Sequence, residues 1–146
     1  MSHKYDALLL KNQLCFPLYA VSKEIIRLYK PFLDPLNLTY TQYITMMVLW
    51  ETDNLMVKEL GERLYLDSGT LTPVLKKLEV QGYITRNRGT ENERNVYIQV
   101  TKSGWQLRES ALSVPEGILK CLDLNIEDAK TLYGLLYKIL NASPKT

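Results

Sequence analysis

Cys15 has the most distinctive chemistry in this chain of 146 residues, which holds two cysteines and ten tyrosines. A cysteine reacts as its thiolate, so a reactive cysteine needs neighbours that stabilise the anion. Tyr19 lies four residues later, one turn along a predicted helix and on the same face. Its hydroxyl can donate a hydrogen bond to a thiolate without adding charge. Such a thiolate could attack a hydroperoxide and become a sulfenic acid; the alternative is an inert buried cysteine.

A long helix is predicted to carry Cys15, because apolar residues recur at alternating steps of four and three. Tyr29 lies on the face of Cys15, but fourteen residues along a straight helix place it ~21 Å further on. Pro31 and Pro35 are expected to end the helix, and Pro17 to bend it beside Cys15. The apolar stripe consists of Leu14, Leu18, Val21, Ile25, Leu28 and Phe32.

Cap residues and apolar spacing predict three shorter helices in the middle of the chain. Thr39 and Thr41 can cap the first of them, and Asp67 or Ser68 can cap the third. Gly82 is placed to end that third helix. The helix between them is expected to turn three apolar side chains inward: Val57, Leu60 and Leu64.

The hydrophobic period then changes from helical to alternating. Segments 83–88 and 94–100 are predicted to be strands, joined by the polar stretch 89–93 as a hairpin. Two short helices joined by a tight turn and followed by a hairpin make a winged helix-turn-helix. The second helix of the pair can enter the major groove, and the hairpin can reach the minor groove or the backbone.

The outward side chains of this unit are suited to duplex DNA. Hydroxyls can donate to bases or phosphates, and residues 68–104 contain six basic side chains against three acidic ones. The alternative is a protein-binding module whose charged faces are simply solvated. The candidate DNA-binding residues are Asp67, Ser68, Thr70, Thr72, Pro73, Lys76, Lys77, Arg86, Arg88 and Arg94.

Two more helices are expected, one that begins at Thr101 and is kinked by Pro115, and one capped by Asn125. The predicted fold is therefore mainly α with a small β-hairpin wing, in a single domain of residues 1–146. The DNA-binding part takes about 41–101. The end segments, about 6–35 and 102–143, are apolar over more surface than this part can cover, which predicts a homodimer formed by the N- and C-terminal helices.

Two motifs give the chain a resemblance to a known family. The run Gly-Glu-Arg-Leu-Tyr-Leu-Asp-Ser-Gly-Thr-Leu-Thr-Pro at 61–73, with Val-Leu-Lys-Lys-Leu-Glu after it, resembles the recognition region of MarR-type regulators. Asn-Gln-Leu-Cys-Phe at 12–16, with Tyr-Lys-Pro at 29–31 and Leu-Thr-Tyr at 38–40, is similar to the OhrR branch, repressors that sense organic hydroperoxides. The likeness extends from about Lys11 to the last helix.

The resemblance implies that Cys15 is the peroxide sensor, that Tyr29 and Tyr40 hydrogen-bond its sulfur, and that Tyr19 lies near. Once this contact is accepted, the spacing of Cys15 and Tyr29 implies a site shared between two chains with antiparallel first helices. Cys121 is either a resolving thiol or core packing. Oxidation would change the spacing of the two recognition helices, which must match a pseudo-palindromic operator with grooves ~34 Å apart, and repression would end.

The sequence departs from the family pattern in three places, one of which is the second cysteine, Cys121, in the fifth predicted helix. The wing of the family usually reads Asp-x-Arg, where this chain has Asn92, Glu93 and Arg94. We expect an ion pair that orients the arginine to be weakened to a neutral hydrogen bond. Pro17 stands in the first helix where the family carries an apolar residue.

Composition narrows the class of protein. The hydrophobic content of 46% and charged content of 23% are typical of a globular protein, and the longest apolar run, 43–50, is too short to cross a bilayer. Without an export signal we expect a cytoplasmic location. No metal-ligand cluster, phosphate-binding glycine loop or Ser-His-Asp set is present, so neither a cofactor nor an enzyme is predicted. A thiol peroxidase is disfavoured as an alternative, because such enzymes usually have an α/β scaffold and the sequence shows no βαβ pattern. The remaining alternative is a MarR-type regulator released by a small aromatic or phenolic ligand, with Cys15 not redox-active.

Overall fold

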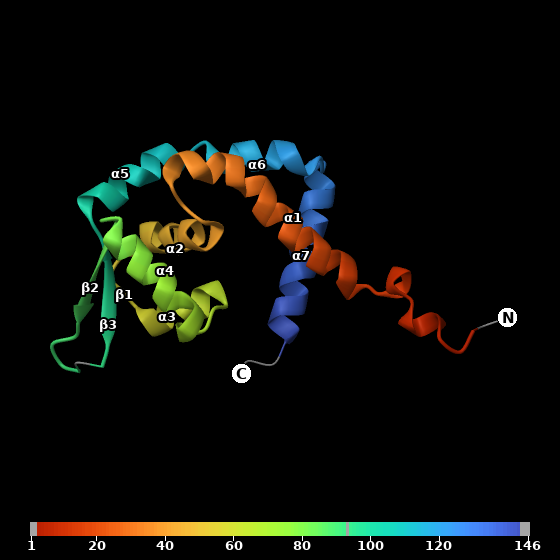
Figure 1. Cartoon of the computed structure of the whole chain (residues 1–146), viewed down its shortest axis with the longest axis horizontal. Coiled ribbons are helices and arrows are strands. Elements are labelled where there is room, and N and C mark those ends of the chain that lie inside the picture. The colour runs from red at the N-terminus through yellow and green to blue at the C-terminus, as the bar shows by residue number, and fades with distance from the viewer. Residues whose placement is uncertain (1–2, 93, 144–146) are drawn as a thin grey trace.

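The computed structural model describes residues 3–92 and 94–143. Its architecture is mainly helical with one small sheet (Figure 1). Glu93 of the predicted hairpin tip lies outside the described residues. The helices and strands are α1 (Cys15–Leu33), α2 (Tyr40–Glu51), β1 (Leu55–Met56), α3 (Val57–Leu64), α4 (Ser68–Val80), β2 (Ile84–Arg88), β3 (Val96–Val100), α5 (Lys102–Ala111), α6 (Val114–Leu122) and α7 (Ile126–Ala142).

The sheet has three antiparallel strands in the order β1-β3-β2. The predicted hairpin is confirmed, with Ile84 opposite Val100 and Arg86 opposite Ile98. Strand β1 was not predicted, because two residues are too few to show an alternating pattern. Its pairing of Leu55 with Ile98 ties the start of α3 to the root of the hairpin.

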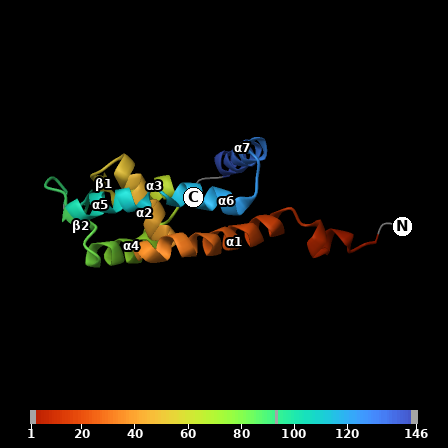
Figure 2. The same cartoon turned by 90° about the horizontal axis from the view of Figure 1, so that it is seen from above.

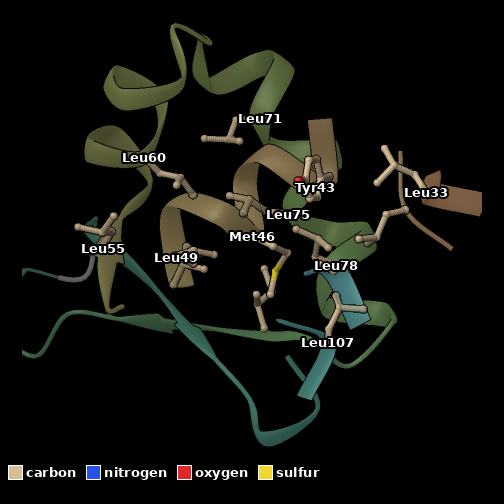
Figure 3. Packing of buried hydrophobic residues seen from close by; sticks show 14 of the residues in the cluster. Leu33, Tyr43, Met46, Leu49, Leu55, Leu60, Leu71, Leu75, Leu78 and Leu107 are labelled. Atoms are coloured by element: carbon tan, nitrogen blue, oxygen red, sulfur yellow. The ribbon is translucent and has the colours of Figure 1, made fainter. Parts of the chain in front are cut away.

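The core lies between the short helices and the sheet. Met46 and Leu49 of α2 are fully buried and lie at its centre, as Figure 3 shows. Apolar side chains of α3, α4, α5 and the sheet surround them, so α3 and α4 are fixed by one continuous core. The surrounding buried residues include Leu55, Leu60, Leu71, Leu75, Leu78, Ile84, Ile98 and Leu107.

Local capping interactions fix where α2 and α4 begin and where α4 ends. Thr39 forms a capping box with Gln42 at the start of α2. The Asp67 side chain accepts a hydrogen bond from the Thr70 backbone N–H at 2.7 Å and begins α4. Gly82, with φ +85°, turns the chain from α4 into the hairpin in a conformation that side chains disfavour. Asp67 and Gly82 therefore have the roles that the sequence predicted.

The prolines at the two ends of α1 act only partly as predicted. The helix ends at Leu33, between Pro31 and Pro35 as expected, but Pro31 lies inside it, and Pro35 is the second residue of a short 3-10 turn, Asp34–Leu36. Pro17 falls in the first turn, where its missing N–H has no intrahelical acceptor in any case. Pro17 therefore does not have to bend the helix beside Cys15.

The C-terminal part is also divided differently from the prediction. The helix expected to be kinked at Pro115 is two helices, with α5 ending at Ala111 and α6 starting at Val114. Pro115 occupies the first turn of α6, because its ring would clash with a carbonyl one turn earlier in a continuous helix. Helix α6 packs on α1, and a Cβ at Gly117 would overlap the Phe32 ring.

Helix α7 stands apart from this assembly (Figure 2). Asn125 caps it by accepting from the Asp128 N–H, as predicted. None of its residues is buried, although one side of it is rich in leucine. Across residues 3–92 and 94–143, no helix has both the length and the hydropathy needed to span a membrane.

Candidate redox and DNA-binding sites

Cys15 is the first residue of α1, and its thiol is exposed. Tyr19 is exposed one turn later, on the same side of the helix. Its hydroxyl accepts a hydrogen bond from the Lys23 ammonium at 2.9 Å, and that ammonium lies 4.8 Å from the centre of the Tyr19 ring. Within one chain, Tyr19 is therefore near Cys15 but held by Lys23.

Tyr29 and Tyr40 come together at the far end of α1, where α2 begins. Their ring centres are 4.8 Å apart, and Tyr43 completes the cluster at 5.8 Å from Tyr29 and 6.5 Å from Tyr40. The sequence did not single out Tyr43, although its position three residues after Tyr40 places both on one helical face. The tyrosine cluster, defined as Tyr29, Tyr40 and Tyr43, joins α1 to α2.

The environment of this cluster keeps its hydroxyls protonated. Burial, with Tyr40 and Tyr43 alongside, raises the pKa of Tyr29 to about 12. Burial also raises the pKa of Tyr40 and of Tyr43. All three side chains are therefore neutral hydrogen-bond donors at neutral pH, the form needed to hold an anionic sulfur.

A single chain does not bring Cys15 to this cluster. Helix α1 is continuous from Cys15 to Leu33, so the fourteen residues to Tyr29 span ~21 Å along its axis. A hollow of about 240 Å³ borders Tyr40 instead. Its lining residues are Ile26, Arg27, Lys30, Leu33, Asp34, Leu38, Thr39 and Tyr40.

The predicted recognition helix presents its polar side chains outward. Hydrogen bonds from Thr70 hold the pKa of the Asp67 carboxyl below its ordinary value, so this cap remains ionised. The Thr72 hydroxyl donates to the Ser68 carbonyl at 2.7 Å, which leaves its lone pairs for another partner. The exposed candidates on or beside α4 are Asp67, Ser68, Thr70, Thr72, Pro73, Lys76 and Lys77.

The wing exposes two of its three predicted arginines. Arg88 lies at the end of β2 and Arg94 just before β3, both exposed. The Asn92 side chain accepts from the backbone N–H of Arg94 at 3.0 Å. Asn92 thus shapes the turn at the tip through the main chain of Arg94, which differs from the side-chain contact expected from the sequence.

Arg86 is placed differently from these two arginines. Its guanidinium donates to the Glu79 carboxylate at 2.9 Å, and the two side chains are only 30% and 37% exposed. A hollow of about 460 Å³ borders Arg86 and is lined by residues of α3, α4 and the wing. Its lining residues include Lys58, Thr72, Leu75, Arg86, Arg94 and Asn95.

Known proteins share both the sequence and this arrangement. The profile of the SarA/Rot transcriptional regulators matches residues 27–110. MarR from E. coli, solved as a mutant with operator DNA, has the same fold, with a TM-score of 0.78, 24% identity and coverage of 95% of this chain and 99% of that one. The organic hydroperoxide resistance transcriptional regulator of Bacillus subtilis (strain 168) is 51% identical over 140 residues, covering 96% of this chain and 95% of that protein.

This chain belongs to the OhrR branch of the MarR family. Another similar protein is AbfR of Staphylococcus epidermidis, which has been solved in reduced and in overoxidised form bound to DNA. Its reduced form bound to DNA matches with a TM-score of 0.77 and 34% identity over 95% of this chain and 97% of that one. The homologues of this OhrR-branch chain are transcriptional regulators rather than enzymes.

The second thiol of this OhrR-branch chain, Cys121, lies near the end of α6 and is exposed. The buried side of α6 carries Val114 and Ile118. Within one chain, Cys121 therefore does not fill the core, and both thiols are free.

Proposed function

We propose that this chain is a DNA-binding transcriptional repressor of the cytoplasm that senses organic hydroperoxides by oxidation of Cys15. The observation that carries the proposal is its likeness, over nearly the whole chain, to an organic hydroperoxide resistance regulator, in a chain whose Cys15 thiol is exposed. Oxidation of Cys15 then releases the operator.

The DNA-binding step uses the exposed side of α4 and the wing. Helix α4 enters the major groove with Ser68, Thr70 and Thr72 in its first turns, and Lys76 and Lys77 follow along the phosphates. Arg88 and Arg94, exposed on the hairpin, reach the backbone or the minor groove. The solved DNA complex of reduced AbfR, similar to this chain over most of its length, supports duplex DNA as the partner.

The repressor acts as a homodimer formed through α1 and α7. Helix α1 exposes Val21 and Ile26, and α7 exposes several leucines, apolar side chains of the kind that a monomer would normally bury. A second copy is the natural cover for these faces, because symmetric pairs are the commonest assemblies. The exposed apolar residues on the two helices include Val21, Ile26, Leu132, Leu135, Leu136, Ile139 and Leu140.

The sensor is then a composite of two chains. If the first helices cross antiparallel, Cys15 of one chain lies beside the tyrosine cluster of the other. Tyr29 and Tyr40, whose hydroxyls are protonated at neutral pH and have pKa values raised further by burial, donate to the Cys15 thiolate. The hollow beside Tyr40, apolar on the side of Ile26 and Leu38, gives room for the organic group of the oxidant.

The reaction balances without a cofactor. The Cys15 thiolate attacks the terminal oxygen of the hydroperoxide, the O–O bond breaks, and the alkoxide takes up a proton to leave as an alcohol. The resulting sulfenic acid condenses with a thiol, with loss of water, to form a disulfide. That thiol is Cys121 of the partner or a free small thiol.

The test is operator binding by the reduced protein before and after a stoichiometric organic hydroperoxide, with Cys15→Ser alongside. We expect native protein to lose binding and to regain it with excess thiol, while Cys15→Ser keeps its binding throughout. Unchanged binding of native protein after peroxide would remove the redox role and leave DNA binding intact. A small phenol that releases DNA from Cys15→Ser would then identify the alternative, a ligand-released regulator.

A further inference from the structure

One ion pair joins the recognition helix directly to the wing. Glu79 is the penultimate residue of α4, and Arg86 is the middle residue of β2. Between them the chain reverses at Gly82. The pair, with Arg86 Nη2 donating to Glu79 Oε1 at 2.9 Å, therefore closes the corner at which the wing leaves α4.

The direction of the Arg86 side chain follows from the strand. Alternate residues of β2 share one face, and Ile84, two residues before Arg86, is buried in the core. Arg86 consequently points toward the core side, against α4. Its Nε is buried and has no hydrogen-bond partner among the described residues. Arg88 and Arg94, in contrast, are exposed.

We infer that Glu79 and Arg86 are positioning residues that set the angle of the wing relative to the recognition helix. The inference rests on the proposed DNA-binding function. The hairpin of β2 and β3 is held to the rest of the chain by the pairing of β1 with β3. Its tip extends beyond this pairing. A small rotation at the corner would move Arg94 away from the groove while α4 remained in place.

The surroundings of the pair fit this role. Arg86 holds the pKa of the Glu79 carboxyl below its ordinary value, so the pair is fully charged at neutral pH. A half-exposed ion pair adds little to overall stability. Its contribution is to geometry, because it links two elements that must contact the same DNA.

A direct DNA contact by Arg86 predicts the opposite response at Glu79. If Arg86 bound a phosphate, Glu79 would be an acid beside the DNA, and its neutralisation would leave affinity unchanged or increase it. If the pair positions the wing, the same substitution weakens binding although it removes a negative charge. The sign of the effect therefore separates the two roles.

The experiment measures affinity and footprints on a duplex that the native protein has selected from a random library. For Glu79→Gln we expect binding weakened about threefold per half-site, about tenfold for two half-sites. The matched control is Glu91→Gln, an acid in the hairpin with no ion pair among the described residues, which should bind as native or more tightly. In hydroxyl-radical footprints of the DNA, protection of the nucleotides that the wing contacts should fall. Protection of the nucleotides that α4 contacts in the major groove should persist.

Charge exchange keeps the test decisive if a single variant is poorly folded. The double variant Glu79→Arg with Arg86→Glu restores the pair and should recover most of the native affinity and wing protection. Native or tighter binding by Glu79→Gln, or uniform loss of all protection with an unchanged unfolding temperature, would overturn the inference. Failure of the native protein to select any duplex would refute the proposed function instead.

Discussion

The shared sensor can be tested by mixing two chains that are each defective in one half of the site. Helix α1 is unbroken from Cys15 to Leu33, so Cys15 and Tyr29 of one chain lie ~21 Å apart along its axis. If Tyr29 serves the partner's cysteine, a Cys15→Ser chain can supply the native tyrosine to a Tyr29→Phe chain. The second site of the same mixed dimer holds neither group.

The rates of Cys15 oxidation, and the share of thiols that react at each rate, follow from this pairing. Loss of a hydrogen bond to a charged sulfur costs about 1.5 kcal/mol, so Tyr29→Phe alone should oxidise about tenfold more slowly. When equal amounts of the two chains are unfolded together and refolded, half of the dimers are mixed. Half of the Cys15 thiols should then react at the native rate and half at the slow rate. Cys121→Ser in every chain restricts the readout to Cys15.

The assay follows loss of the thiol over time after an excess of organic hydroperoxide, so that both populations of Cys15 react to completion. Tyr5→Phe is a suitable control, because Tyr5 is an exposed tyrosine before α1, and its mixture with Cys15→Ser should react wholly at the native rate. A single slow phase in the Tyr29→Phe mixture would refute a site shared between chains. A native rate for Tyr29→Phe alone would refute the role of Tyr29.

Three further predictions concern stability and assembly. Gly61→Ala should destabilise the fold by about 1–3 kcal/mol in chemical unfolding, because the new Cβ would lie 2.7 Å from the Leu66 carbonyl oxygen; Gly69→Ala, with its nearest neighbour atom at 3.5 Å, should be neutral or stabilising. Because the pKa of Tyr29 is raised from 10.0 to about 12, its protonated form is favoured in the folded chain, so stability should fall as pH rises from 10.0 to about 12; a Tyr29→Phe chain with an equal fall in that range would contradict this. Leu135→Asp on the exposed face of α7 should yield monomers in sedimentation, and an intact dimer would place the interface elsewhere.

Much of the fold could be predicted because its signals are local. Asp67 and Gly82 begin and end the reading helix through hydrogen bonds and backbone conformations that involve only their immediate neighbours. The change of period at Ile84 likewise marks the hairpin. Pro17 and Pro115 were misjudged because the effect of a proline depends on where a helix starts; Pro17 is harmless because α1 begins at Cys15, and Pro115 lies in the first turn of α6.

The site was harder to predict where contacts join separate elements. The contact of Glu79 with Arg86 depends on how α4 meets β2 across the turn at Gly82, and no periodic pattern encodes that angle. Tyr43 joins Tyr29 only after α1 and α2 pack together. The proposed cysteine-to-tyrosine contact is harder still to predict, because Cys15 and Tyr29 lie at opposite ends of one helix and would meet only across two chains.

The isolation of α7 links the fold to the number of copies in a cell. In the proposed dimer, a helix with no buried residues in its own chain would gain its order from the partner that covers it, so the free energy of unfolding would depend on the concentration of chains. At low copy number a growing share of chains would be unpaired, without a complete sensor and with only one recognition helix each. Operator occupancy would then fall more steeply than the concentration of the protein. Synthesis of the protein and its dilution at cell division would therefore affect the proposed target gene alongside the peroxide signal.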